Sequence, residues 1–161
     1  MEIERKWLLP RNFTVTQTIF KTIITKQFYL GDIRIRRTKI NDIEDCIHYI
    51  AVKSDGTISR EEWEMEIPEW VFNQLLLSKP NSPEIFKTIY KFKINDLILE
   101  LHIFAGKLAG LIILECEFTD EATAVVFNLP SEIDQQVIKE VTHDKNYQNI
   151  NLATLNGLDK K

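Results

Sequence analysis

Acidic and basic residues occupy alternate positions at the start of the sequence. Glu2, Glu4 and Lys6 alternate with residues that include Ile3 and Trp7. In a β-strand, alternate side chains point to the same face, so the two carboxylates and the lysine would lie together. Carboxylates about 6 to 7 Å apart suit a hard divalent cation, and a lysine beside them can hold an anion. A charged strand face is more often simply solvated, so this segment alone is weak evidence for a metal site.

The same alternation recurs along most of the chain, and like charges pair on one face. Acids pair with acids in some segments and bases with bases in others. Neighbouring like charges repel, and a surface selected only for solubility mixes the signs. The pairing therefore favours a binding function, although an open sheet with one wet face is the alternative. The charged positions on these later faces are Arg34, Arg36, Lys53, Arg60, Glu62, Glu64, Glu66, Lys87, Lys91, Glu100, Glu115 and Glu117.

A closed barrel would bring these charged faces together in its lumen. A buried ion without compensation costs on the order of several kcal/mol, so a dry lumen of this kind would be unstable. A water-filled tunnel resolves this conflict if carboxylates bind Mg²⁺ or Mn²⁺ and the bases bind a polyanion. Mg²⁺ fits because it takes one or two protein carboxylates and completes its shell with water and substrate phosphates. No glycine-rich phosphate loop is present, so side chains must bind the phosphates.

Strands are the elements expected to position most of these residues. Turn signals at 54–56, 95–96 and 105–107 predict hairpins and hence antiparallel pairing. We predict an α+β, mainly β fold: a closed antiparallel barrel with a charged lumen, a few helices outside, and the three tryptophans in the core beneath them. Strands are expected over 2–9, 26–40, 46–54, 58–67, 85–94, 97–105 and 110–118. Helices are expected over 69–79, 120–128 (capped by Thr119), 131–140 and 145–155, while 12–24 fits a short helix or a loop.

Composition narrows the class of protein. A chain of 161 residues with 44% hydrophobic and 27% charged residues is typical of one soluble globular domain. The net charge of −4 argues against bulk binding to nucleic acid or an anionic membrane. Apolar runs are too short to span a bilayer, no signal-peptide layout is seen, and two cysteines form neither a disulfide framework nor a zinc motif. We expect a cytoplasmic protein, either a monomer or a homodimer.

Taken together, the motifs resemble the CYTH superfamily, also called triphosphate tunnel metalloenzymes. This group includes thiamine triphosphatases, inorganic triphosphatases and class IV adenylyl cyclases. The likeness covers nearly the full length, and its specificity comes from the order and spacing of motifs that are individually loose. The matching segments are E-x-E-x-K at 2–6, R-x-R at 34–36, the strand lysine at 53, S-R-x-E-x-E-x-E-I-P at 59–68, K-T-I-Y at 87–90, E-x-E at 115–117, and the closing E-V-T-x-D…Y-x-N-x-x-L-A at 140–153.

The resemblance implies an eight-stranded antiparallel tunnel that hydrolyses a triphosphate, and we expect inorganic tripolyphosphate to be cleaved to pyrophosphate and phosphate. A lysine whose pKa is lowered by neighbouring cations would take the proton of the attacking water, and Lys6 and Lys87 are the candidates. The implied metal ligands are Glu2, Glu4, Glu115 and Glu117, supported by Glu62, Glu64 and Glu100. The implied phosphate-binding residues are Lys6, Arg34, Arg36, Lys53, Arg60, Lys87 and Lys91.

Three residues depart from the family pattern. Ile89 stands where an arginine is common, His102 where an acid usually follows Glu100, and Asn146 where an arginine is common near the end. A neutral histidine can bind Mn²⁺ or a softer metal, or can be satisfied by hydrogen bonds within the protein. These changes keep three alternatives open: a nucleoside or thiamine triphosphatase, a class IV-type adenylyl cyclase, or a non-catalytic polyphosphate-binding module.

Overall fold

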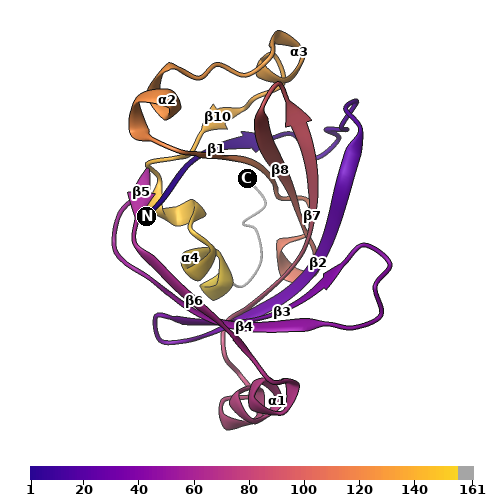
Figure 1. Cartoon of the computed structure of the whole chain (residues 1–161), viewed down its shortest axis with the longest axis vertical. Coiled ribbons are helices and arrows are strands. Elements are labelled where there is room, and N and C mark those ends of the chain that lie inside the picture. The colour runs from indigo at the N-terminus through magenta and orange to yellow at the C-terminus, as the bar shows by residue number, and fades with distance from the viewer. Residues whose placement is uncertain (156–161) are drawn as a thin grey trace.

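The strands form one antiparallel sheet that curls into a nearly closed barrel (Figure 1). The computed structural model describes residues 1–155. The strand order is β10-β1-β9-β8-β7-β2-β3-β4-β6, and β5 pairs with β1. The strands are β1 (Glu2–Leu9), β2 (Ile19–Leu30), β3 (Ile33–Ile40), β4 (Ile47–Lys53), β5 (Ser59–Arg60), β6 (Glu62–Ile67), β7 (Glu84–Ile94), β8 (Leu97–Phe104), β9 (Ile112–Phe118) and β10 (Lys139–Glu140).

A short pairing between β5 and β1 brings the two ends of the sheet together. The strand predicted over 58–67 is interrupted at Glu61, whose carbonyl accepts a hydrogen bond from the Ser54 backbone N–H at 2.9 Å. Before the interruption, Arg60 pairs with Glu2 of β1; after it, β6 pairs with β4. The number of strands in the barrel depends on whether β5 and β10, with 2 residues each, are included.

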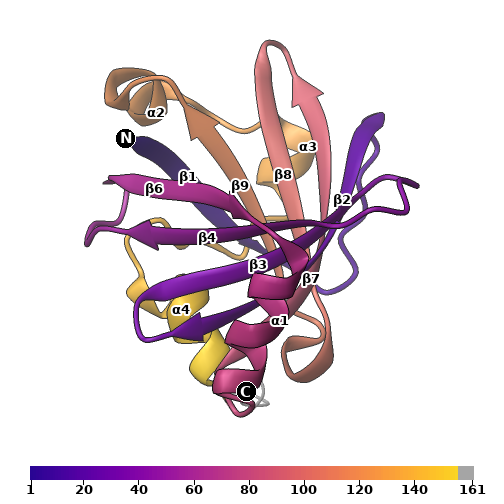
Figure 2. The same ribbon diagram turned by 60° about the horizontal axis from the view of Figure 1, so that its bottom comes forward.

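Helices cover the outside of the barrel at two places. Figure 1 shows α1 on one side of the ring and α2 and α3 on the opposite side, and Figure 2 shows α1 lying across the outside of the sheet. Within the described residues, no helix is long and apolar enough to cross a membrane. The helices are α1 (Glu69–Ser78), α2 (Glu121–Val126), α3 (Ser131–Asp134) and α4 (Asn149–Thr154), with 3-10 helices η1 (Gly106–Leu108) and η2 (Lys145–Tyr147).

Apolar side chains on the outer faces of the strands pack under these helices. Trp7, Leu114 and Phe118 are buried in a cluster that includes residues of α2 and α3. Phe28 and Phe72 belong to a second cluster, beneath α1. A third cluster lies on the inner faces of the strands, where Tyr29 and Ile85 pack against Leu152 and Ala153 of α4. The outer faces are therefore apolar and packed under α1, α2 and α3, while the inner faces carry the charged residues and, where α4 packs, apolar ones.

The first half of the sequence contains the largest errors in the predicted elements. The single strand expected over 26–40 is two strands, because Gly31 (φ +60°) and Asp32 form a tight turn between β2 and β3. The segment 12–24, expected to be a short helix or a loop, contributes residues from Ile19 onward to β2. Its β-branched residues pair with β7, which supplies the partner strand that the local sequence does not reveal.

Several helical predictions also need correction. α2 is capped by Asp120 rather than Thr119, because the Asp120 side chain accepts a hydrogen bond from the Thr123 backbone N–H at 2.7 Å. The expected helix over 131–140 ends at Asp134 and is followed by β10. The helix expected over 145–155 divides into η2 and α4.

Only one of the three tryptophans expected in the core is buried. Trp7 is 4% exposed, whereas Trp63 and Trp70 are 55% and 68% exposed. α1 covers only part of the outer face of β6, so the side chain of Trp63 remains exposed to solvent.

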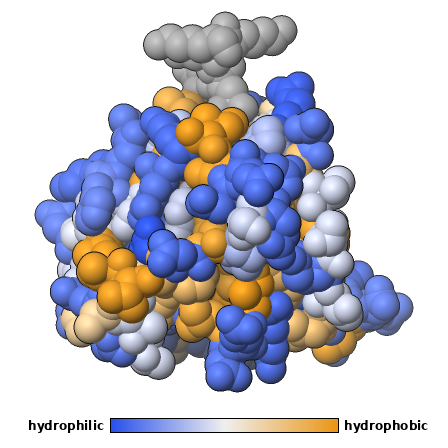
Figure 3. Space-filling model, turned by 90° about the horizontal axis from the view of Figure 1, so that it is seen from above, coloured by the Kyte–Doolittle hydropathy of each residue, from blue (hydrophilic) through white to orange (hydrophobic). Residues whose placement is uncertain are grey.

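Figure 3 shows the surface after a 90° rotation from the view of Figure 1. Hydrophobic patches on this face are separated by hydrophilic side chains.

We expect Phe72→Ala to lower the free energy of unfolding by about 3–5 kcal/mol, because it would leave a cavity under α1. Phe72 is 1% exposed, and its ring lies 5.5 Å from that of Phe28. Trp70→Ala, on the exposed face of the same helix, should change stability by no more than about 0.5 kcal/mol. Urea unfolding followed by circular dichroism measures both, and equal losses would contradict the packing described for α1.

Candidate active site

A cavity of about 280 Å³ lies inside the barrel and gathers most of the residues predicted to bind metal or phosphate. They come from strands on both sides of the barrel, since β1 and β9 contribute acids and β3 contributes arginines. The predicted site residues on its wall are Glu2, Glu4, Arg34, Arg36, Lys53, Glu62, Glu64, Lys91, Glu100, Glu115 and Glu117.

The three remaining predicted residues lie beside this cavity. Lys6 and Arg60 line a second cavity of about 250 Å³ that shares Arg34 and Lys53 with the first. Lys87 lines neither cavity and is 5% exposed. The structure therefore brings the predicted residues into one region but places Lys87 behind the cavity wall.

Ion pairs hold the acids of β1 against bases from neighbouring strands. Lys53 Nζ lies 2.6 Å from Glu2 Oε2, and Arg60 Nη2 lies 2.7 Å from Glu4 Oε1. Lys6 Nζ is 3.0 Å from a carboxylate oxygen of Glu4 and 3.0 Å from one of Glu115. Burial disfavours the charge on Lys6, but Glu115 and Glu4 outweigh it and raise its pKa. Lys6 is therefore held as a cation, suited to binding an anion rather than taking a proton.

Two arginines of β3 line the cavity, and each has a buried N–H group without a hydrogen-bond partner among the described residues. Arg34 Nη2 pairs with Glu62 and Glu64 at 2.9 and 2.8 Å, and Arg36 Nη2 pairs with Glu64 at 2.9 Å. Among the described residues, the buried side-chain polar atoms without a hydrogen-bond partner are Arg34 Nε, Arg36 Nε, Thr38 Oγ1 and His48 Nε2. The first three belong to residues on the cavity wall. Buried donors are rarely left unsatisfied, so these groups indicate an anionic ligand with several acceptor oxygens.

Glu117 differs from the other acids because no ion pair in residues 1–155 holds it. It is the cross-strand partner of Glu4. Burial, together with the charges of Glu2, Glu100 and Glu4, raises the pKa of Glu117. A divalent cation among these oxygens would relieve the repulsion, so the residues present fit a hard metal ion.

Lys87 is in the opposite electrostatic situation from Lys6. Burial and the nearby cations Lys6, Arg34 and Arg36 outweigh the attraction of Glu115 and lower the pKa of Lys87 to about 7. Its Nζ lies 2.9 Å from His102 Nδ1 and 3.3 Å from Asn149 Oδ1. Of the two candidate bases, the surrounding charges favour Lys87, because its pKa is lowered whereas that of Lys6 is raised.

The three departures from the family pattern lie in different surroundings. Ile89 lines the cavity at 5% exposure, and His102, its direct cross-strand partner, is 3% exposed. Both ring nitrogens of His102 have partners, since Nε2 is 3.2 Å from Glu100 Oε2. Asn146 lies in η2, where its backbone N–H donates to Asp144.

The sequence missed part of the cavity wall. Lys21 and Ile23 of β2 line it, and Ile23 pairs with Ile40 on one side and Ile89 on the other. Lys21, Ile23 and Thr25 occupy alternate positions, which would have placed them on one face of a strand. Residues 21–25 were not predicted to form a strand, so this alternation was not used.

We expect Ile89→Arg to tighten the binding of tripolyphosphate by about tenfold, because one charge-assisted hydrogen bond contributes roughly 1.5–3 kcal/mol. Isothermal titration calorimetry measures this. Ile33→Arg is the matched control, since Ile33 lies on the outer face of β3 at 37% exposure. An affinity unchanged by Ile89→Arg, in a folded variant, would place this side chain away from the bound phosphates.

Comparison with known proteins agrees with the geometry. An inorganic triphosphatase of Acetivibrio thermocellus is 33% identical over 153 residues, covering 94% of this chain and 92% of the relative. One from Nitrosomonas europaea is 31% identical over 159 residues, covering 94% and 96%. The crystal structure of the inorganic triphosphatase NE1496 superimposes with a TM-score of 0.64 at 27% identity, covering 95% of this chain and 94% of that one. No family model matches the sequence.

A nearly closed antiparallel barrel with paired acids and bases around an internal cavity is the architecture expected of a triphosphate tunnel. With relatives above 30% identity along almost its whole length, the chain belongs to the CYTH superfamily, in the group of the inorganic triphosphatases.

Proposed function

We propose that this protein is a divalent-metal-dependent triphosphatase that hydrolyses inorganic tripolyphosphate to pyrophosphate and phosphate. The observation that carries the proposal is the set of unsatisfied buried donors on the cavity wall, Arg34 Nε, Arg36 Nε and Thr38 Oγ1. A chain of phosphates offers acceptor oxygens at close intervals, whereas a single carboxylate offers only two. The inorganic triphosphatases that resemble the chain along most of its length support the same reaction.

We infer one eight-stranded tunnel domain with a charged lumen, in which acids and bases have separate tasks. Arg34, Arg36, Lys53 and Arg60 would hold the phosphate oxygens, and Lys6 would add a fixed positive charge. Glu2, Glu4, Glu115 and Glu117 would hold Mg²⁺ or Mn²⁺, supported by Glu62, Glu64 and Glu100. Many of these acids and bases form ion pairs with each other. The phosphates of the substrate would take the place of the acids beside the bases, and the metal cation would take the place of the bases beside the acids.

The chemistry is positioning and charge neutralisation. A divalent cation held by the acids would supply positive charge that stabilises the phosphate oxygens during transfer of the terminal phosphoryl group to water, with pyrophosphate as the leaving group. Arg34 and Arg36 add charge-assisted hydrogen bonds aimed at the same oxygens. Neutral Lys87, which lies behind the cavity wall, would accept the proton of the attacking water through one intervening water. The His102 ring and Asn149 lie within hydrogen-bond distance of the Lys87 amine and position it.

Phosphate release tests the proposal most simply. Tripolyphosphate, ATP, thiamine triphosphate and pyrophosphate are each supplied with Mg²⁺ or Mn²⁺, and free phosphate is measured. We expect turnover of tripolyphosphate to exceed that of the other three. No turnover of any substrate, with tight tripolyphosphate binding, would show a binding module instead. Absence of both turnover and binding would exclude the tunnel function altogether.

The setting we propose is the cytoplasm. Cys46 is exposed and Cys116 is buried, and neither forms a disulfide. Burial raises the pKa of Cys116 to about 12, which keeps its thiol neutral and unreactive.

A further inference from the structure

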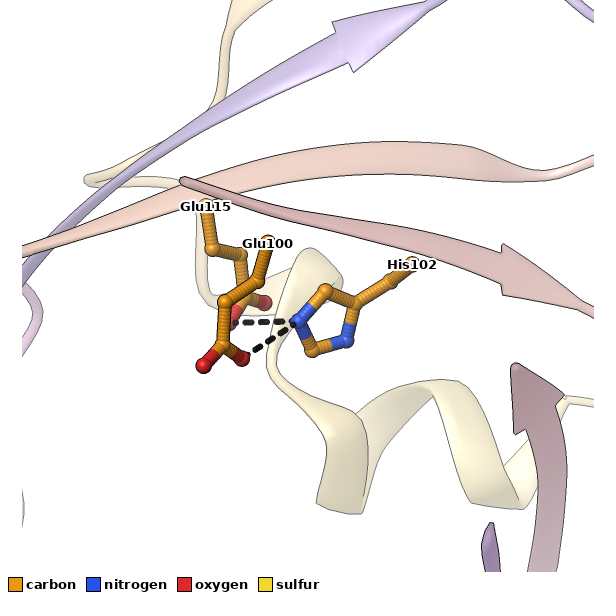
Figure 4. A group of neighbouring side chains, drawn as sticks. All are labelled: Glu100, His102 and Glu115. Atoms are coloured by element: carbon orange, nitrogen blue, oxygen red, sulfur yellow. Dashed lines mark hydrogen bonds and ion pairs between the residues drawn. The ribbon is translucent and has the colours of Figure 1, made fainter. Parts of the chain in front are cut away.

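Three ligand atoms from two neighbouring strands converge at one point of the cavity region. His102 Nε2 lies 3.2 Å from Glu100 Oε2 and 3.4 Å from Glu115 Oε2. Figure 4 shows both carboxylates turned toward the same ring nitrogen. Glu100 and Glu115 line the cavity, whereas His102 is buried behind them, with 3% of its surface exposed.

The spacing of these atoms suits a single small cation. Two ligand atoms that are each about 2.1 Å from a metal ion lie roughly 3.0–3.4 Å apart in octahedral or tetrahedral geometry. The two separations measured from His102 Nε2 fall in this range. All three ligand atoms lie within 4.8 Å of one another. A cation could therefore bind among these three atoms with small movements of the side chains.

Each ligand is also oriented by a partner on its far side. Glu100 uses its other oxygen, Oε1, for Lys91, and Glu115 uses its Oε1 for Lys6 at 3.0 Å. The second ring nitrogen of His102, Nδ1, lies 2.9 Å from Lys87 Nζ. Hydrogen-bonded outer partners fix the direction of carboxylate ligands and are a regular part of built metal sites. Their presence separates this cluster from a chance group of surface acids.

The donor set determines which cation it prefers. Carboxylates alone suit Mg²⁺, whereas imidazole favours first-row transition metals. We propose that His102, with Glu100 and Glu115, forms a mixed nitrogen and oxygen site that binds a first-row transition-metal cation such as Mn²⁺ or Co²⁺ in preference to Mg²⁺. This inference rests on the proposed metal-dependent function, and it assigns the choice of cation to one residue. The acids Glu2, Glu4 and Glu117 on the cavity wall offer oxygen alone.

Pulsed electron paramagnetic resonance of the full chain with Mn²⁺ as the only ligand tests the assignment. We expect a nitrogen coupling from a directly bound imidazole in the unsubstituted protein and none in His102→Gln. The affinity for Mn²⁺, measured by calorimetry, should fall by about tenfold or more in His102→Gln, the scale of loss that even outer partners of metal sites produce. The affinity for Mg²⁺ should change less.

His48→Gln is the matched control, because His48 is an equally buried histidine whose ring packs on Phe72 outside the cavity. The coupling should persist in this variant. A spectrum without nitrogen coupling in the unsubstituted protein overturns the assignment, whether or not the variants fold. Tripolyphosphate turnover in the same samples separates the two proposals: turnover without nitrogen coupling removes only the His102 site, and absent turnover removes the proposed function.

Discussion

Glu117→Gln should reduce metal-dependent phosphate release by about 100-fold or more, because it removes a metal-binding carboxylate, and even outer partners of metal sites contribute 10–100-fold in affinity. The fold should survive. Glu117 has no ion pair in the described part of the chain, and its pKa is raised by burial and by neighbouring acids. Removing its charge therefore relieves repulsion. Phosphate release at saturating and limiting Mn²⁺ measures the loss, and urea unfolding measures stability.

Two further variants sharpen this result. Glu4→Gln should also lose activity but should destabilise the protein, because Glu4 pairs with Lys6 and Arg60. Glu132→Gln, on the exposed surface of α3, should leave both quantities unchanged. Full activity in folded Glu117→Gln would show that the metal ligands have been wrongly assigned.

Lys87→Met should lower the maximal rate by about 10²–10⁴-fold, the range that a positioned general base contributes. The unsubstituted enzyme should gain activity as pH rises through about 7, since the pKa of Lys87 is lowered to about 7 and only its neutral amine accepts a proton. In Lys87→Met this rise should disappear. The measurement is the pH dependence of phosphate release at saturating substrate. Lys26→Met, on the outer face of β2, is the control.

The same pKa shift has a consequence for stability. Lys87 has a pKa of about 7 in the folded state against 10.5 in the unfolded chain, so the unfolded chain binds more protons between these values. The contribution of Lys87 to the free energy of unfolding should therefore rise with pH from about 7 to about 10.5 and stay constant below 7. Lys87→Met should remove this slope. An identical slope in both proteins would place the depressed pKa elsewhere.

The residues that face the cavity could be predicted from sequence because they follow the simplest rule of strand geometry. Alternation alone placed Glu2 and Glu4 on one face of β1, and Arg34 and Arg36 on one face of β3. The rule needs no knowledge of which strands are neighbours. The resemblance to a family then supplied what alternation cannot, namely that the charged faces turn inward and what they bind.

The parts that escaped prediction depend on contacts distant in sequence. The first half of β2, over residues 19–25, is recognisable as a strand only through its pairing with β7, and the Thr-rich segment before it resembles a loop. The exposure of Trp63 depends on how far α1 extends over β6, which no local pattern records. The relation of Lys87 to His102 and Asn149 joins three elements, so the difference in pKa between Lys6 and Lys87 also required the folded structure.

A crystal structure of Glu117→Gln with tripolyphosphate would test the central claim most directly. We predict density for the phosphate chain inside the barrel, with oxygens accepting hydrogen bonds from Arg34 Nε and Arg36 Nε, the donors that now lack partners. The proposed function would be contradicted if tripolyphosphate bound only on the outer surface, while Arg34 kept its ion pairs with Glu62 and Glu64 and Arg36 kept its ion pair with Glu64.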